Sequence, residues 1–247
     1  SQSSGSVSSG FLGGSNSDNG YGIAVDSAGN VYLTGTSTGT WGSPMRAYTS
    51  GQDAFVAKLN SDGALQWNTF LGDSGNDNGY GIALDGNGNV YVEGYSNATW
   101  GSPVRAYTSD QDTFTAKLNS NGALQWNTFL GGSLADYGYY IVVDGSGNVY
   151  VSGYSSDTWA SPVRPYASGQ DAFIAKLNSN GTLLWNTFLG GTDLDNGRGI
   201  GVDGSGNIYV VGFSKANWGS PVLAYSAGND AFIAKLNSNG TLLWNTF

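Results

Sequence analysis

The residues that could do chemistry recur along the sequence in four equivalent aromatic loops. Trp41 opens a Trp-(Gly/Ala)-Ser-Pro motif that returns every 59 residues, and Arg and Tyr follow it five and seven residues later. Aromatic rings stack on the apolar C–H faces of sugars, while Arg donates hydrogen bonds to hydroxyl or carboxylate oxygens. Leu223 takes the place of Arg in the fourth loop. The predicted ligand-binding residues are Trp41, Arg46, Tyr48, Trp100, Arg105, Tyr107, Trp159, Arg164, Tyr166, Trp218 and Tyr225.

The same loop aromatics have a structural explanation. A long loop needs a small core of its own, so Trp and Tyr could instead fold the loop back onto the strands or fill the space between repeats. One binding site per repeat would make the protein multivalent, and multivalency strengthens weak affinities through avidity. The loop sequence is compatible with both explanations.

Composition excludes several classes of function. The 247 residues include no Cys and no His, which removes thiol chemistry, disulfides and the commonest general base. The net charge of −9 and a pI near 4.1 argue against nucleic acid or an anionic membrane as partner. No apolar run approaches the ~20 residues that a membrane-spanning helix needs, so we predict no membrane insertion. The acidic residues that depart from the repeat are scattered over different positions, so we predict no enzymatic activity.

The elements that position these loops follow from the repeat. The sequence divides into a leader, residues 1–11, and four copies of 59 residues at 12–70, 71–129, 130–188 and 189–247. In the second copy, four short runs rich in β-branched and aromatic residues are bounded by Gly, Asn, Asp and Ser, which is typical of strands. These runs are Tyr80–Asp85, Asn89–Tyr95, Asp112–Asn119 and Ala123–Leu130.

Four such strands form an antiparallel sheet that cannot bury both of its faces alone. Radial stacking of the sheets buries them, so we predict an all-β fold. The predicted fold is a β-propeller of four four-stranded antiparallel blades, with residues 12–247 as a single domain. The tight turns fall at one end of the blades and the long aromatic loops at the other, where binding sites usually lie.

The repeat also resembles a known family. Gly22–Ser37 (GIAVDSAGNVYLTGTS) and Asp53–Gly72 (DAFVAKLNSDGALQWNTFLG) have counterparts in all four copies. This pattern is similar to the bacterial β-propeller repeat family SBBP. The resemblance implies a propeller whose first strand is innermost, in a secreted or surface protein, and it implies no single activity. We therefore expect an extracellular or cell-surface location.

An innermost first strand would bring four acidic residues to the mouth of the channel. Asp18, Asp77, Asp136 and Asp195 each stand two residues before a Gly at the entry to the first strand. Converging carboxylates repel one another unless they are protonated or bridged by a cation. We therefore consider these four residues as a metal site with Ca²⁺ as the candidate ion, and we predict no other cofactor. The alternative is that each one caps its own strand through an Asx turn.

The leading functional prediction is non-enzymatic, multivalent carbohydrate recognition by the aromatic loops on one face. The alternative is a structural subunit of an extracellular filament or surface layer. The predicted partners are accordingly glycans or further copies of the chain. The leader, residues 1–11, could add an extra strand to its own ring or to a neighbour. A closed four-blade monomer, an eight-blade dimer and a filament are all compatible with the repeat.

Overall fold

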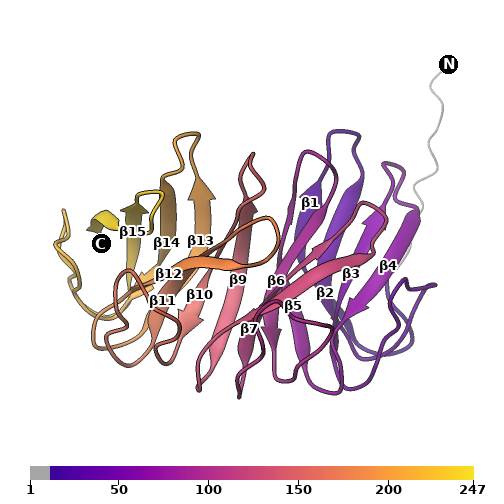
Figure 1. The fold of residues 1–247 in the computed structure, drawn as a ribbon, viewed down its shortest axis with the longest axis horizontal. Helices are drawn as coiled ribbons and strands as arrows, with labels where there is room; N and C mark the ends of the chain where they lie inside the picture. The colour runs from indigo at the N-terminus through magenta and orange to yellow at the C-terminus, as the bar shows by residue number, and fades with distance from the viewer. Residues whose placement is uncertain (1–11) are drawn as a thin grey trace.

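The computed structural model describes residues 12–247, and all of their regular secondary structure is β-strand (Figure 1). These residues form four antiparallel sheets of four strands, which confirms the predicted fold class. The extra strand predicted for the leader lies outside the described residues. Within residues 12–247 no helix has the length and hydropathy that a membrane span would require.

Each sheet is one copy of the repeat, with its strands in chain order. The first blade holds β1 (Asp18–Val25), β2 (Val31–Ser37), β3 (Asp53–Leu59) and β4 (Leu65–Leu71). The second holds β5 (Asp77–Leu84), β6 (Val90–Ser96), β7 (Asp112–Leu118) and β8 (Leu124–Leu130). The third holds β9 (Asp136–Val143), β10 (Val149–Ser155), β11 (Asp171–Leu177) and β12 (Leu183–Leu189). The fourth holds β13 (Asp195–Val202), β14 (Ile208–Ser214), β15 (Asp230–Leu236) and β16 (Leu242–Thr246).

The tight turns are held by their own side chains. The Oδ1 atom of Asp85 accepts hydrogen bonds from the backbone amides of Asn87 and Asn89, both at 2.9 Å. The side-chain amide of Asn89 and the Tyr91 hydroxyl both donate to Oδ2 of Asp85. The carboxylate thereby fixes the hairpin that joins β5 to β6, as Asp and Asn commonly do in turns.

The sheets pack radially. Each inner strand packs against the inner strand of the next blade: β1 against β5, β5 against β9, and β9 against β13. The strands β5, β9 and β13 also pack against the middle strands of the preceding blade. No pair of outer strands packs in this way within residues 12–247, so the blades converge at their first strands and diverge at their fourth. This is the propeller arrangement, with the first strand innermost.

The four blades form an open arc. The first and fourth blades lie at opposite ends of the molecule (Figure 1), and no strand of one packs against a strand of the other in the part of the chain described. Ile23 on β1 is therefore 70 % exposed, whereas its counterpart Ile141 on β9 is 6 % exposed. Two blade faces, one at each end of the arc, consequently meet no neighbouring blade.

The hydrophobic core lies at the junctions between blades. We call the side of a blade that meets the preceding blade its front face, and the side that meets the following blade its back face. At the first junction, Tyr32 and Val56 from the back face of the first blade pack against Val92, Trp100 and Phe114 from the front face of the second. Equivalent clusters fill the second and third junctions. Each blade thus completes the core of its neighbour.

Candidate ligand-binding groove

The four Trp rings of the aromatic loops are buried in the blades. Trp41 is 7 % exposed, and Trp100, Trp159 and Trp218 are 1 %, 4 % and 4 % exposed. The ring of Trp100 meets Phe114 and Phe129 edge-on, with centroids 5.2 and 5.9 Å away. The other three rings have the same geometry. The loops therefore have the small core of their own that the structural explanation requires.

The loop arginines join one blade to the next. The guanidinium of Arg105 donates to the backbone carbonyls of Phe129 and Gly131, both at 2.8 Å. Its Cζ atom lies 5.7 Å from the centroid of the Trp159 ring in the following blade. Arg46 and Arg164 make the same contacts at the other two junctions. These charges are held by backbone oxygens and an aromatic face.

The loop tyrosines also bond within the loop. The hydroxyl of Tyr107 donates to the carbonyls of Asn97 and Asp110, and its ring meets Phe129 at 5.6 Å. Tyr48, Tyr166 and Tyr225 donate to their own loops in the same way. The structure therefore places the eleven predicted ligand-binding residues inside the loops and does not gather them on an open surface. Their binding role stays a prediction, and this geometry gives it no support.

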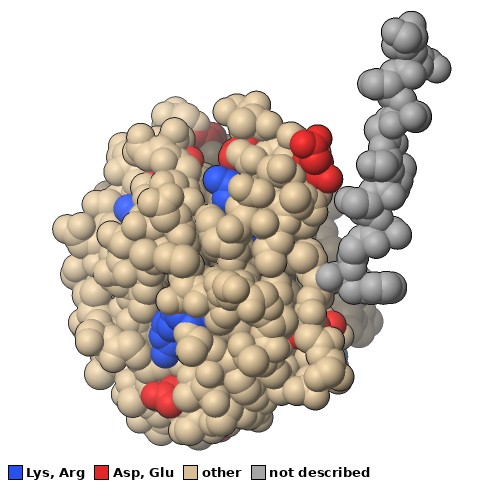
Figure 2. Space-filling model, turned by 90° about the vertical axis from the view of Figure 1, so that its right-hand side faces the viewer, with Lys and Arg blue, Asp and Glu red and all other residues tan. Residues whose placement is uncertain are grey.

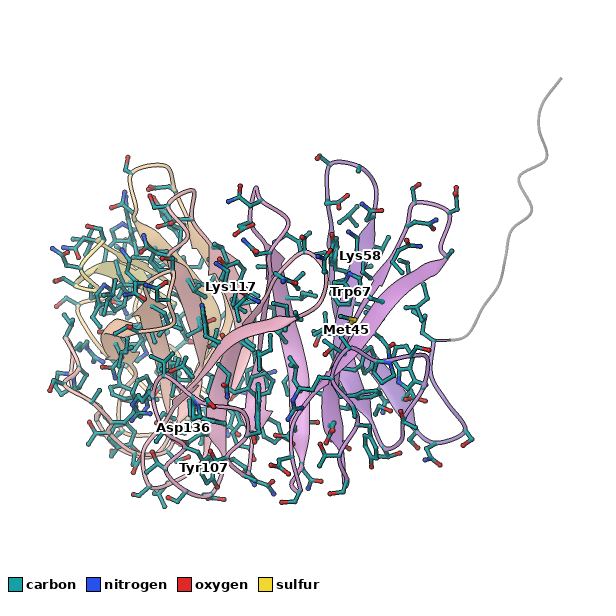
Figure 3. The ribbon with its side chains drawn as sticks, turned by 45° about the vertical axis from the view of Figure 1, so that its right-hand side comes forward. Met45, Lys58, Trp67, Tyr107, Lys117 and Asp136 are labelled. Carbon is teal, nitrogen blue, oxygen red and sulfur yellow. The ribbon has the colours of Figure 1, made fainter. Side chains whose placement is uncertain are left out.

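Asp18, Asp77, Asp136 and Asp195 each hold their own strand entry. Oδ2 of Asp136 accepts a hydrogen bond from the backbone amide of Gly132 at 2.8 Å, and the other three accept equivalent bonds. Figure 3 shows Asp136 and Tyr107 toward the same end of the molecule, the end of the long loops. Among residues 12–247 no group of three or more acidic side chains is arranged to hold a metal ion. The Ca²⁺ site stays a prediction, and the hydrogen bonds match the strand-capping alternative.

Asp77, Asp136 and Asp195 each lie beside a carboxyl of the preceding blade. A Cβ atom at Gly72 would lie 2.9 Å from Oδ1 of Asp53 and 2.5 Å from Oδ2 of Asp77, so the two fully buried carboxyls flank the same point. Burial raises the pKa of Asp53 to about 6 and that of Asp77 to about 7. Removal from water is the main cause, and for Asp77 the neighbouring carboxyl adds to it. The second and third junctions carry the same pairs.

A different set of residues faces an open cavity on the inner strands. One repeat position is Tyr21 on β1, Tyr80 on β5, Tyr139 on β9 and Arg198 on β13. With Tyr140, these four side chains line a cavity of about 230 Å³. We call this set of five residues the tyrosine–arginine groove. All four blades contribute to it.

The groove contains a continuous row of tyrosine rings that ends at the positively charged guanidinium of Arg198. The ring centroids of Tyr21 and Tyr80 are 5.0 Å apart, and those of Tyr80 and Tyr139 are 5.5 Å apart. The Cζ atom of Arg198 lies 4.6 Å from the centroid of Tyr139. Burial raises the pKa values of Tyr80 and Tyr139, so their hydroxyls stay protonated at neutral pH and can donate hydrogen bonds.

A β-bulge aims these side chains into the groove. Gly20 and Gly22 pair with successive residues of β2, so Tyr21 between them has no partner in the ladder. The register skips the same repeat position at Tyr80, Tyr139 and Arg198. Bulges redirect side chains in this way and are frequent next to functional sites.

The groove residues were not predicted from the sequence, although a signal for them exists. Tyr140 stands where the other copies have Gly22, Gly81 and Gly199, and Arg198 stands where they have Tyr. A position-by-position comparison of the copies identifies both departures. At these two positions the four copies, which are otherwise nearly alike, carry different side chains around the central axis.

Comparison with known proteins gives the family. An uncharacterised WD repeat-containing protein of Acanthamoeba polyphaga mimivirus is 22 % identical over 76 % of this chain, which spans only 17 % of that protein's length. A solved structure described provisionally as a gluconolactonase is 17 % identical, with a TM-score of 0.38, over 79 % of this chain and 55 % of that one. The model of the SBBP β-propeller repeat matches residues 11–40, 66–99, 125–158 and 185–217, more than half of the chain. Because these matches fall in all four blades, the chain belongs to the SBBP family of β-propeller repeats.

Proposed function

We propose that this chain is a non-enzymatic, extracellular binding module that takes carbohydrate in the tyrosine–arginine groove. The observation that carries the proposal is the convergence of one repeat position from all four inner strands on a single cavity. Tyr21 is 52 % exposed and Tyr140 is 45 % exposed, so a ligand can reach their rings. Aromatic faces of this kind suit the C–H faces of a sugar ring.

Polar groups beside the rings would orient the sugar. Arg198 can donate to hydroxyl or carboxylate oxygens, and the tyrosine hydroxyls can donate to ring substituents. The five groove residues include no carboxylate and no activated nucleophile, so they supply neither the acid nor the base that glycoside hydrolysis requires. The groove therefore suits binding, and we propose that the sugar leaves unchanged.

The test is calorimetric titration with neutral oligosaccharides and with oligosaccharides that contain uronic acids. The variants Tyr140→Gly and Arg198→Tyr each install the residue that other copies carry, so they are expected to fold. Both should weaken binding at least tenfold. Preferential loss of the uronic-acid ligands in Arg198→Tyr would assign a carboxylate to the guanidinium.

Tyr225→Phe is the matched control, because it removes only a loop hydroxyl that is bonded to its own loop. It should bind as the wild type does. Undiminished binding in both groove variants, or binding lost only in Tyr225→Phe, would refute the groove as the site. Absence of binding to every oligosaccharide would refute carbohydrate as the ligand class.

A further inference from the structure

The two unpaired blade faces at the ends of the arc are the two halves of a junction that the molecule already makes three times. We propose that the back face of the fourth blade binds the front face of the first blade in a second copy of this chain. Two copies then close an eight-blade ring. The proposal concerns assembly and does not depend on the ligand of the tyrosine–arginine groove.

The apolar positions at the two ends match those buried at the internal junctions. On the back face, Ile233 is 46 % exposed, whereas its counterparts Val56 and Ile174 are fully buried against the following blade. On the front face, Ile23 is 70 % exposed, whereas its counterpart Ile82 packs into the first junction cluster together with Val56. The partner that would cover Ile233 is therefore a residue in the position of Ile23.

A Trp and a Gly at the opposite ends fit each other in the same manner. At the internal junctions, the Trp67 ring lies against Gly122, where a Cβ atom would be 2.7 Å from the ring. The Trp67 indole also donates to the carbonyl of Ser120 at 3.2 Å. The corresponding Trp244 is 37 % exposed, and among residues 12–247 nothing lies within 4 Å of a Cβ atom at Gly63. The Trp244 ring of one copy would therefore pack against Gly63 of the other.

One departure of the back face from the internal junctions is also apolar. Position 223 is Leu where the internal junctions have Arg, and Leu223 is 64 % exposed at the back face. In the internal junctions this position lies over the Trp of the following blade. The second copy would present Trp41 there. Figure 2, which looks at the first-blade end of the molecule, shows a surface with few charged side chains. Leu223 can therefore pack on Trp41 without bringing a buried charge.

Ring size follows from the symmetry of the contact. A front face that binds a back face is a heterologous contact, which closes a ring or grows a filament. Four blades leave the arc open, and propellers typically contain about four to eight blades. Two copies of the 247-residue chain supply eight, the one multiple of four from five to eight. Such a ring has two identical junctions between the copies.

The test is the mass of the 247-residue chain by light scattering during gel filtration. The wild type should give twice 25.6 kDa. Ile233→Lys and Ile23→Lys each damage one half of the junction and should each halve the mass. Leu243→Lys is the control, because that position is exposed in an internal blade as Leu184 and carries Gln in two copies. It should remain a dimer.

Mixing separates this contact from a symmetric one. An equimolar mixture of Ile233→Lys and Ile23→Lys retains one undamaged back face and one undamaged front face, so a two-copy species should reappear. Circular dichroism that matches the wild type shows that the variants are folded. A wild type of 25.6 kDa at every concentration refutes the association. A mass that keeps growing beyond two copies refutes ring closure, and a mixture that stays monomeric refutes the front-to-back contact.

Discussion

Glu93 should destabilise the protein at neutral pH, and replacing it with Thr should remove the penalty. Glu93 lies on β6 at the second junction, is fully buried, and neither of its carboxyl oxygens has a hydrogen-bond partner. Burial raises its pKa well above the ordinary value of 4.5. An ionised carboxylate there would lack a counter-charge, so burial favours the protonated form in the folded protein.

The magnitude follows from the cost of taking up that proton. Each unit by which burial raises the pKa of Glu93 above 4.5 costs about 1.4 kcal/mol of stability at neutral pH, so a pKa well above 4.5 costs more than about 1.4 kcal/mol. The sign follows from linkage: the pKa is higher in the folded state, so the carboxyl weakens folding as pH rises above 4.5. The counterpart Thr34 donates to the carbonyl of Phe55 at 2.8 Å. Thr at position 93 should add about 1 kcal/mol through the equivalent bond.

Urea unfolding of wild type, Glu93→Thr and Glu93→Gln at pH 4.5 and pH 7 tests this reasoning. Glu93→Gln keeps the shape without a titrating group, so it should stabilise the protein by more than about 1.4 kcal/mol at pH 7 and hardly at all at pH 4.5. Glu93→Thr should exceed it at both pH values. Equal midpoints for wild type and Glu93→Gln at pH 7 would show that no protonation cost exists.

Two further predictions concern the junctions. Arg105→Leu installs the residue found at position 223 and removes two hydrogen bonds to backbone carbonyls, so it should lower the free energy of unfolding by about 3 kcal/mol. Urea midpoints that do not change would contradict that role. Burial raises the pKa of Asp136 to about 8, so its contribution to stability is present near pH 4 and is lost as pH rises toward 8. Asp136→Asn should show a smaller fall in melting temperature between pH 4 and pH 8, and an unchanged fall would contradict the assignment.

Strands and turns could be predicted from the sequence because their determinants are local. The run at Asp112–Asn119 became β7 almost residue for residue, and β5 merely begins earlier because Asp77 and Asn78 pair with β6. The open arc could not be predicted. The residues that form a junction are repeated at the two ends, where no neighbour is present. Ile23 and Ile82 therefore look alike in sequence and differ only in structure.

The direction of side chains limited the prediction of the site. The loop aromatics were predicted as binding residues, yet the Trp100 ring turns inward to Phe114 and accepts Arg46 from the preceding blade. The Phe rings of its own blade decide that orientation, because Trp41 in the first blade has the same geometry without a preceding blade. The groove was missed for the opposite reason. Tyr139 belongs to an ordinary strand pattern, and only the bulge in β9 aims it at the axis.

Because neighbouring blades share a hydrophobic core, the stability of each blade against local unfolding depends on the blades beside it. In an array whose units contact only their neighbours, stability is close to a sum of unit and nearest-neighbour free energies. The second and third blades have two neighbours, whereas the first and fourth have one each. Amide hydrogens of β15 should therefore exchange with solvent sooner than those of β7 and β11, because the fourth blade can open without disrupting the rest. Closing the ring would give every blade two neighbours and make that protection uniform.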